Sequence, residues 1–159
     1  MKSSTIAKLV KARFAGSAFS KEYFAVLCDL NDSPTAKTLA ALVKNSGRVD
    51  ALTRVAPEQR WTHYWKAKNS VWQLDLLLLS PALADQLRPN RVSLERHGIG
   101  YRADSQTNPG QLLPKQLKFE AVDDDLQPMA IDFQSERFDD VSNENTASDH
   151  CPVFCDFKL

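Results

Sequence analysis

The feature that most constrains this chain is a run of four leucines, Leu76–Leu79, directly after the acid Asp75. The run is far too short to cross a bilayer. Apolar runs of this length that are bounded by turn residues, here Pro81, are typical of a strand. We therefore predict a strand over Val71–Ser80. Asp75 is costly inside so apolar a strand unless its carboxylate is paired or hydrogen-bonded, which makes it a candidate functional group.

Composition is that of an ordinary globular protein. The chain has 159 residues, 43% hydrophobic and 25% charged, which suits one domain with a real core and excludes wholesale disorder, collagen and a coiled coil. Twenty basic residues balance twenty acidic ones, so any binding of nucleic acid must come from a local basic patch. Three cysteines without a Cys-x-x-Cys spacing indicate reduced thiols. With no signal-peptide pattern, we expect a cytoplasmic protein without a membrane span.

Periodicity and turn residues predict both helices and strands. Residues Ile6–Phe14 carry one apolar helical face, and the apolar run Tyr23–Cys28 predicts a strand buried on both faces. Ser33 and Pro34 are a typical helix opening, so we predict a helix over 35–43 whose N-terminus would suit phosphate. The other predicted elements are strands over 60–65, 71–80, 92–101 and 151–157, with a hairpin at 66–70, and a short helix over 82–87.

The segment 106–145 differs from the rest of the chain. It contains three prolines and the acidic run Asp123–Asp125, and only 117–122 and 129–133 resemble strands. We predict a loop-rich insertion there. The whole chain, residues 1–159, is expected to be a single domain.

Polar side chains stand at the predicted strand ends. Asp29 and Asn31 flank one leucine, so in an extended chain they point to the same side. Asp149 and His150 are adjacent just before the last strand, and a carboxylate near an imidazole would fix its tautomer and raise its basicity. Carboxylates and an amide at strand ends, Asp75 included, make an oxygen-rich site that suits Mg²⁺ or Mn²⁺. Such a site predicts metal-assisted attack of water on a phosphate ester.

Each of these residues also has a purely structural interpretation. The tripeptide Asp29–Asn31 is typical of a turn in which side chains bond to the backbone. Asp75 can be an edge-strand residue that faces water, and Asp149 with its neighbour can be a polar loop. His63 is interpreted as a half-buried strand residue, and His97 as a surface histidine.

Four motifs occur in a characteristic order: Cys-Asp-Leu-Asn-Asp-Ser-Pro, Trp-Thr-His-Tyr-Trp, Trp-Gln-Leu-Asp-Leu-Leu-Leu-Leu-Ser-Pro and Ala-Ser-Asp-His-Cys-Pro-Val. The order resembles the endonuclease/exonuclease/phosphatase superfamily, whose elements are Gly-Asp-Phe-Asn, an aromatic Tyr-Thr-x-Trp strand, Arg-Ile/Leu-Asp-Tyr and Ser-Asp-His-x-Pro. The resemblance covers residues 6–83 and 148–159. It implies an α+β fold, a DNase-I-like β-sandwich with α/β/β/α layers, here incomplete because the N-terminal half is lacking.

The resemblance also implies roles for the residues at the matching positions. Asp29 would orient or deprotonate the attacking water or assist the leaving oxygen, and Asn31 would hold that water or a phosphate oxygen. His150 would contact the scissile phosphate, and Asp75 would orient His150. Asp149, together with Asp29 and Asn31, would hold Mg²⁺ or Mn²⁺.

The chain departs from the family in two ways. Cys28, Leu30 and Leu76 replace a glycine, a phenylalanine and an aromatic residue, all at packing positions. The N-terminal part that supplies an asparagine, the metal-anchoring glutamate and a further histidine or tyrosine is absent, and Glu22 is the only acid before Asp29. A sheet without its partner sheet exposes an apolar face. We expect a missing N-terminal half, a second copy in a homodimer or the 106–145 segment to cover it.

Three functions follow from these observations. The leading one is a metal-dependent phosphoester hydrolase, with nucleic acid, lipid and nucleotide esters as candidate substrates. The second is a catalytically inactive remnant of that family that serves as a binding or assembly module. The third is a nucleic-acid binder that uses a basic, aromatic strip of Lys66, Lys68, Trp65 and Trp72.

Overall fold

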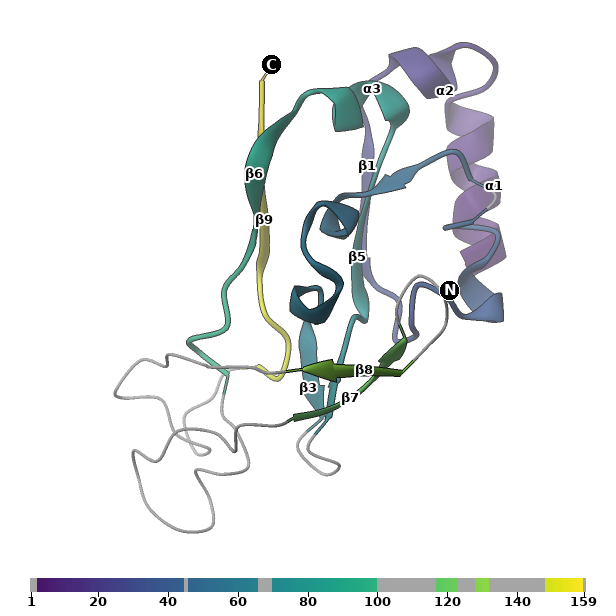
Figure 1. Cartoon of the computed structure of the whole chain (residues 1–159). Helices are drawn as coiled ribbons and strands as arrows, with labels where there is room; N and C mark the ends of the chain where they lie inside the picture. Colours follow the sequence, from purple (N-terminus) through teal and green to yellow (C-terminus); the bar gives the residue numbers. More distant parts are fainter. Residues whose placement is uncertain are drawn as a thin grey trace, which may run out of the picture. The chain divides into compact units, whose positions relative to one another are not determined.

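The structure is a computed structural model that describes residues 3–44, 46–65, 70–99, 117–122, 128–131 and 148–158. These residues have the predicted α+β class, with helices and mainly antiparallel strands (Figure 1). The chain divides into two compact units. The first comprises Met1–Ala56, Leu74–Val92 and Phe154–Leu159, and the second comprises Pro57–Gln73 and Ser93–Val153. The expected single domain over 1–159 stays a prediction.

The leucine run is the central strand of the first unit's sheet. Strand β5 (Asp75–Leu79) lies between β1 (Ala25–Asp29) and β2 (Val49–Asp50) and pairs with both in antiparallel fashion. Figure 1 shows β1 and β5 running side by side. All four leucines of β5 are buried, with Leu79 fully inaccessible. The prediction that Leu76–Leu79 lie in a strand is confirmed.

Both faces of β5 are covered within this unit. Leu76 and Leu78 form a core cluster with Leu39 and Leu42, and partly buried side chains of α1 (Ser3–Arg13) pack against it. Strand β5 also contacts the short 3-10 helix η2 (Ala51–Arg54), whose first two residues are buried. The predicted N-terminal helix is confirmed as α1.

Strand β1 differs from its prediction. It is not buried on both faces, because among the described residues it pairs with β5 alone and so forms an edge of the sheet. Its side chains alternate between exposed and half-buried, and Leu27 is 69% exposed. The run Tyr23–Cys28 is apolar enough for a central strand, but pairing over its full length with only one neighbour leaves half of it uncovered.

The helix predicted over 35–43 is wrong. The segment contains only the 3-10 helix η1 (Lys37–Leu39), followed by turns. The Thr38 hydroxyl donates to the Asp32 carboxylate, and the Ser33 and Thr35 hydroxyls bond to each other at 2.8 Å. Such local side-chain bonds compete with a regular helix. Because an α-helix does not form here, the expected phosphate site at its N-terminus has no support.

The rest of the first unit has two short helices and a two-stranded sheet. Helix α2 (Ala18–Lys21) follows α1, and α3 (Pro81–Asp85) confirms the helix predicted over 82–87. The Ser80 hydroxyl caps α3 by accepting the N–H of Leu83. Strands β6 (Leu87–Leu94) and β9 (Val153–Phe157) pair with each other. The strand predicted over 92–101 is therefore wrong for most of its described length, because β6 ends at Leu94 and residues 95–99 form no strand.

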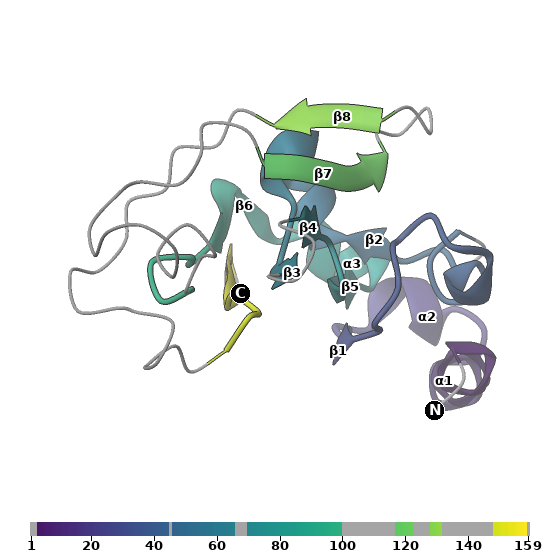
Figure 2. The same ribbon diagram turned by 90° about the horizontal axis from the view of Figure 1, so that it is seen from below.

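The second unit contains a four-stranded sheet in the order β3-β4-β7-β8. Strands β3 (His63–Trp65) and β4 (Ser70–Trp72) are antiparallel, as the predicted hairpin requires. Strand β7 (Leu117–Val122) pairs with β4 in parallel, and Figure 2 shows it beside β8 (Pro128–Ile131). The 3-10 helix η3 (Pro57–Gln59) precedes β3. The strands predicted at 117–122 and 129–133 are confirmed in outline.

One predicted strand is in fact two. The continuous strand expected over Val71–Ser80 breaks at Gln73 and Leu74, so that β4 and β5 join different sheets. Asp75 is consequently the first residue of β5 rather than a residue in the middle of a strand. Most of the predicted insertion over 106–145, including its acidic run, lies outside the described residues. No helix in the described part of the chain combines the length and the apolar character that a bilayer span needs.

The buried leucines should dominate the stability of the first unit. Leu78→Ala leaves a cavity between the sheet and its core cluster, and we expect it to lower the free energy of unfolding by about 2–5 kcal/mol. Urea unfolding measures the change. Leu9→Ala is the matched control, because Leu9 is 59% exposed on α1. Equal losses for the two variants would contradict this assignment of the core.

Candidate functional site

Two carboxylates face each other at one end of the first unit's sheet. Asp29 is the last residue of β1 and Asp75 the first of β5, and the two are register partners. Antiparallel partners share a face of the sheet, and one carboxylate oxygen of each lies within 4.8 Å of the other. Asp29 is exposed and Asp75 is half-buried. The sheet register thus brings together two of the predicted site residues.

Asn31 follows Asp29 in a turn and not in an extended strand. The Asn31 N–H donates to Asp29 Oδ1 at 2.8 Å, and Asn31 has a φ of 51°, in the left-handed region. The Leu30 N–H donates to the Leu74 carbonyl, which keeps the turn against the start of β5. The expected extended geometry is therefore wrong at Asn31, and the turn interpretation describes the backbone. Asn31 remains exposed two residues after Asp29.

The two carboxylates contribute to a raised pKa of a neighbouring thiol. Burial raises the pKa of Cys28, and the negative charges of Asp29 and Asp75 raise it further. This end of the sheet therefore carries a negative field that favours a cation. Cys155, on β9 in the same unit, has its pKa raised to about 11, first by burial and then by Asp50 and Asp156.

In the second unit, the segment with Asp149 and His150 is held along β3 by backbone bonds. The Tyr64 N–H donates to the Asp149 carbonyl at 2.9 Å, and the Cys151 N–H donates to the Thr62 carbonyl at 2.8 Å. His63 and His150 are consequently partners in an isolated antiparallel bridge. The terminal motif is thus folded onto the aromatic strand motif, and both histidines are positioned by the main chain.

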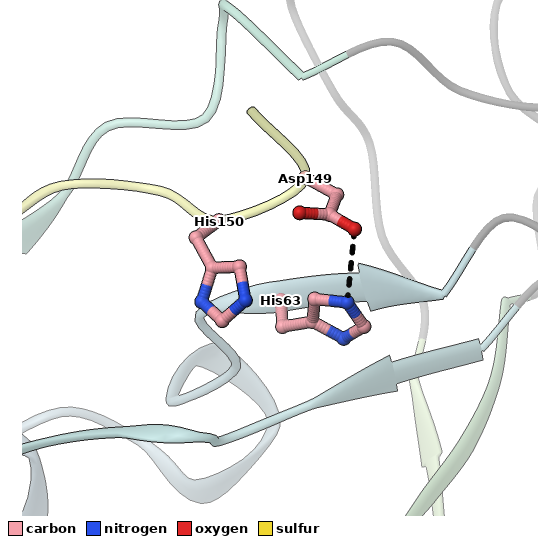
Figure 3. Close-up of side chains that lie close together, drawn as sticks. All are labelled: His63, Asp149 and His150. Carbon is pink, nitrogen blue, oxygen red and sulfur yellow. Dashed lines mark hydrogen bonds and ion pairs between the residues drawn. The ribbon is translucent and has the colours of Figure 1, made fainter. Parts of the chain in front are cut away.

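Three side chains meet there, as Figure 3 shows. His63 Nε2 lies 3.3 Å from Asp149 Oδ2, and the ring centroids of His63 and His150 are 4.7 Å apart. One potential ligand atom from each of His63, Asp149 and His150 lies within 4.8 Å of the other two. We call these three residues the histidine cluster.

The histidine cluster has an enclosed side and an open side. The His63 side chain is 12% exposed, whereas that of Asp149 is 64% exposed. Nδ1 of His63 is buried without a hydrogen-bond partner among the residues that the structure describes. Nε2 is therefore the ring nitrogen that His63 presents to Asp149.

Arg96 stabilises the start of the chain segment that leads into β3. Its guanidinium stacks 4.1 Å from the centroid of the fully buried Trp61 ring. It also donates to the carbonyls of Trp61 and Gln59, at 2.8 and 2.6 Å. These contacts fix the backbone two residues before His63, and with it the cluster.

The sequence missed His63 as a member of the site. It was interpreted as a half-buried strand residue, which its burial confirms, but its pairing with His150 depends on contact between distant segments. A signal was present, since the only three histidines of the chain include one in the aromatic motif and one in the terminal motif. The third, His97, bonds to Glu95 and is 40% exposed, as expected of a surface histidine.

The two groups of residues differ in the metal they suit. Mg²⁺ prefers oxygen ligands, so the Asp29 and Asp75 carboxylates fit it. The histidine cluster, with two imidazoles and one carboxylate, does not match that preference. Asp29 and Asp75 belong to the first unit and Asp149 and His150 to the second, so the predicted steering of His150 by Asp75 stays a prediction.

Comparison with protein-family models, with curated proteins and with solved structures finds no match to this chain. The resemblance to the endonuclease/exonuclease/phosphatase superfamily therefore rests on the four motifs alone.

Cys28 offers a test of the field at the sheet end. Asp75→Asn removes a charge that raises the pKa of Cys28, so more of this thiol is ionised at pH 8 and we expect it to be alkylated faster. Peptide mapping by mass spectrometry measures the rate for each cysteine. Cys155 is the internal reference, because Asp75 is not among the groups that raise its pKa. The same acceleration at both cysteines, or none at Cys28, would contradict the assignment.

Proposed function

We propose that this protein is a metal-dependent phosphoester hydrolase of the endonuclease/exonuclease/phosphatase kind, with a DNase-I-like sandwich as its underlying fold. One observation supports the proposal above all: the four motifs meet in pairs. The Asp-Leu-Asn and Leu-Asp-Leu motifs are neighbouring strands with Asp29 opposite Asp75. The Thr-His-Tyr and Ser-Asp-His motifs are joined by the bridge between His63 and His150. If the four motifs are those of the superfamily, we expect them to lie on neighbouring segments of the fold, as these pairs do.

The proposed reaction is in-line attack of water on a phosphorus atom, with departure of an alkoxide leaving group. Asp29, exposed at the sheet end, accepts a proton from the attacking water. Asn31 hydrogen-bonds the water or a phosphate oxygen through its amide. His150 donates an N–H to a non-bridging phosphate oxygen, and Asp75 holds the His150 ring.

The metal ion of this proposal is Mg²⁺ or Mn²⁺, which when bound neutralises phosphate charge as a Lewis acid. Asp29 and Asn31 would hold it together with Asp149, because carboxylate and amide oxygens are the ligands that such an ion prefers. Asp149 is the third carboxylate of the proposed site. The substrate is a phosphodiester, with nucleic acid as the first candidate.

Activity should depend on the acid–base groups. Purified protein with Mg²⁺ or Mn²⁺ is expected to hydrolyse a chromogenic phosphodiester, and Asp29→Ala and His150→Ala should each lower kcat/KM by about 100-fold or more. His97→Ala is the matched control, since it removes the histidine that lies outside the histidine cluster. Equal rates for the wild type and both site variants would refute the roles of Asp29 and His150.

A double variant tests whether residues of both units act in one step. Removing two groups that act together costs far less than the product of the single losses. Asp29→Ala combined with His150→Ala should therefore be about as slow as the slower single variant. Fully multiplicative losses would contradict a shared step while leaving the separate roles intact.

A second function, as a binding or assembly module, is favoured by one observation. Leu27 projects from the middle of edge strand β1 with 69% of its surface exposed, so this strand carries a large apolar side chain without cover. A second copy of the chain that packs on this face would bury it.

Light scattering at increasing concentration tests this second function. We expect a dimer for the wild type and a monomer for Leu27→Glu, because the new charge would be buried in the interface. Leu9→Glu, which places the same charge on an exposed site of α1, should remain dimeric. A wild type that is monomeric at all concentrations would exclude assembly through this face.

A further inference from the structure

The histidine cluster has the donor set of a transition-metal site. It offers two imidazole nitrogens and one carboxylate oxygen, all within 4.8 Å of one another. Two histidines and one carboxylate are a recurrent ligand set for zinc and for other divalent transition ions. We propose that His63, Asp149 and His150 bind a divalent transition-metal ion of the zinc type, and that this site selects it over Mg²⁺.

The spacing of two of the ligand atoms already fits such an ion. Zinc–nitrogen and zinc–oxygen bonds of about 2.0 Å place the ligands of a tetrahedral site about 3.3 Å apart. His63 Nε2 and Asp149 Oδ2 are separated by 3.3 Å. The same two atoms that form the hydrogen bond can therefore coordinate one ion without a change in their separation.

His150 needs only a small adjustment to join them. Its ligand atom lies within 4.8 Å of the other two, so a tetrahedral site requires it to approach by at most about 1.5 Å. His150 is half-buried, and a modest side-chain rotation supplies such a shift. The bridge between His63 and His150 keeps the two rings on the same side of the paired segments.

The surroundings favour entry and retention of an ion. Asp149 is 64% exposed, which opens the site to solvent, while His63 is only 12% exposed and is held by β3. Three protein ligands leave a coordination position for water or for an anionic oxygen, the arrangement of catalytic rather than structural zinc sites. Mg²⁺ lacks the affinity for nitrogen that this donor set demands.

Metal binding by the full chain tests the proposal directly. Calorimetric titration with Zn²⁺ is expected to show one site that an excess of Mg²⁺ does not displace. His63→Ala, His150→Ala and Asp149→Asn should each weaken binding by at least about 10-fold, since even outer-shell changes cost about 10–100-fold. His97→Ala, in the same unit but outside the histidine cluster, should leave binding unchanged. Equal weakening in His97→Ala, or displacement of Zn²⁺ by Mg²⁺, would overturn the proposal.

Cobalt absorption separates this site from binding to cysteine. Co²⁺ bound by nitrogen and oxygen gives visible bands without the strong near-ultraviolet band of thiolate ligands. A near-ultraviolet thiolate band in the wild type, or visible bands that are unchanged in Asp149→Asn, would overturn the proposal. Because the Asp149 side chain is exposed and asparagine has nearly its shape, this variant remains informative even if His63→Ala fails to fold.

The proposal gives Asp149 and His150 another role than they have in the proposed hydrolase, and metal binding is measured without substrate, so the two proposals are tested separately. Zinc binding that depends on the histidine cluster, without any phosphodiester hydrolysis, would refute the hydrolase alone. Magnesium-dependent hydrolysis without zinc binding would refute the transition-metal site alone.

Discussion

Burial of the four leucines of β5 is the constraint from which the first unit is built. A strand that is apolar on both faces needs cover on each side and a neighbour at each edge. Here the core cluster around Leu42 packs on Leu76 and Leu78, the short helix η2 contacts the strand, and β1 and β2 pair with its two edges. Because hydrogen bonding fixes the register of β1 against β5, Asp29 comes to lie opposite Asp75. The acidic end of the sheet is thus a consequence of packing the leucines.

Backbone pairing plays the corresponding part in the second unit. In the Asp149–Cys151 segment Cys151 is buried, and two main-chain bonds to Thr62 and Tyr64 hold the segment beside β3. Trp61 and Arg96 in turn fix the approach to that strand. Main-chain bonds thus position Asp149 although its side chain is largely exposed.

The two sets of side chains differ in chemistry. The sheet end of the first unit offers oxygen ligands, whose negative charges add to the effect of burial in raising the pKa of Cys28. The histidine cluster offers mainly nitrogen. Hard and borderline cations prefer different ligand types, so the two sets of side chains differ in the metal ions that would suit them.

Local sequence determined the N-terminal helix, the leucine strand, the strands at 117–122 and before the C-terminus, and the candidacy of Asp29, Asp75, Asp149 and His150. These follow from periodicity, turn residues and the cost of isolated charges, which act over a few residues. Only the tertiary structure decided that β1 is an edge strand, that side-chain bonds replace a helix after Ser33, that the strand breaks at Gln73, and that His63 joins His150. Each of those depends on which distant segments pair with a strand or pack against it. A pattern within one segment carries no information about the segments that it will contact.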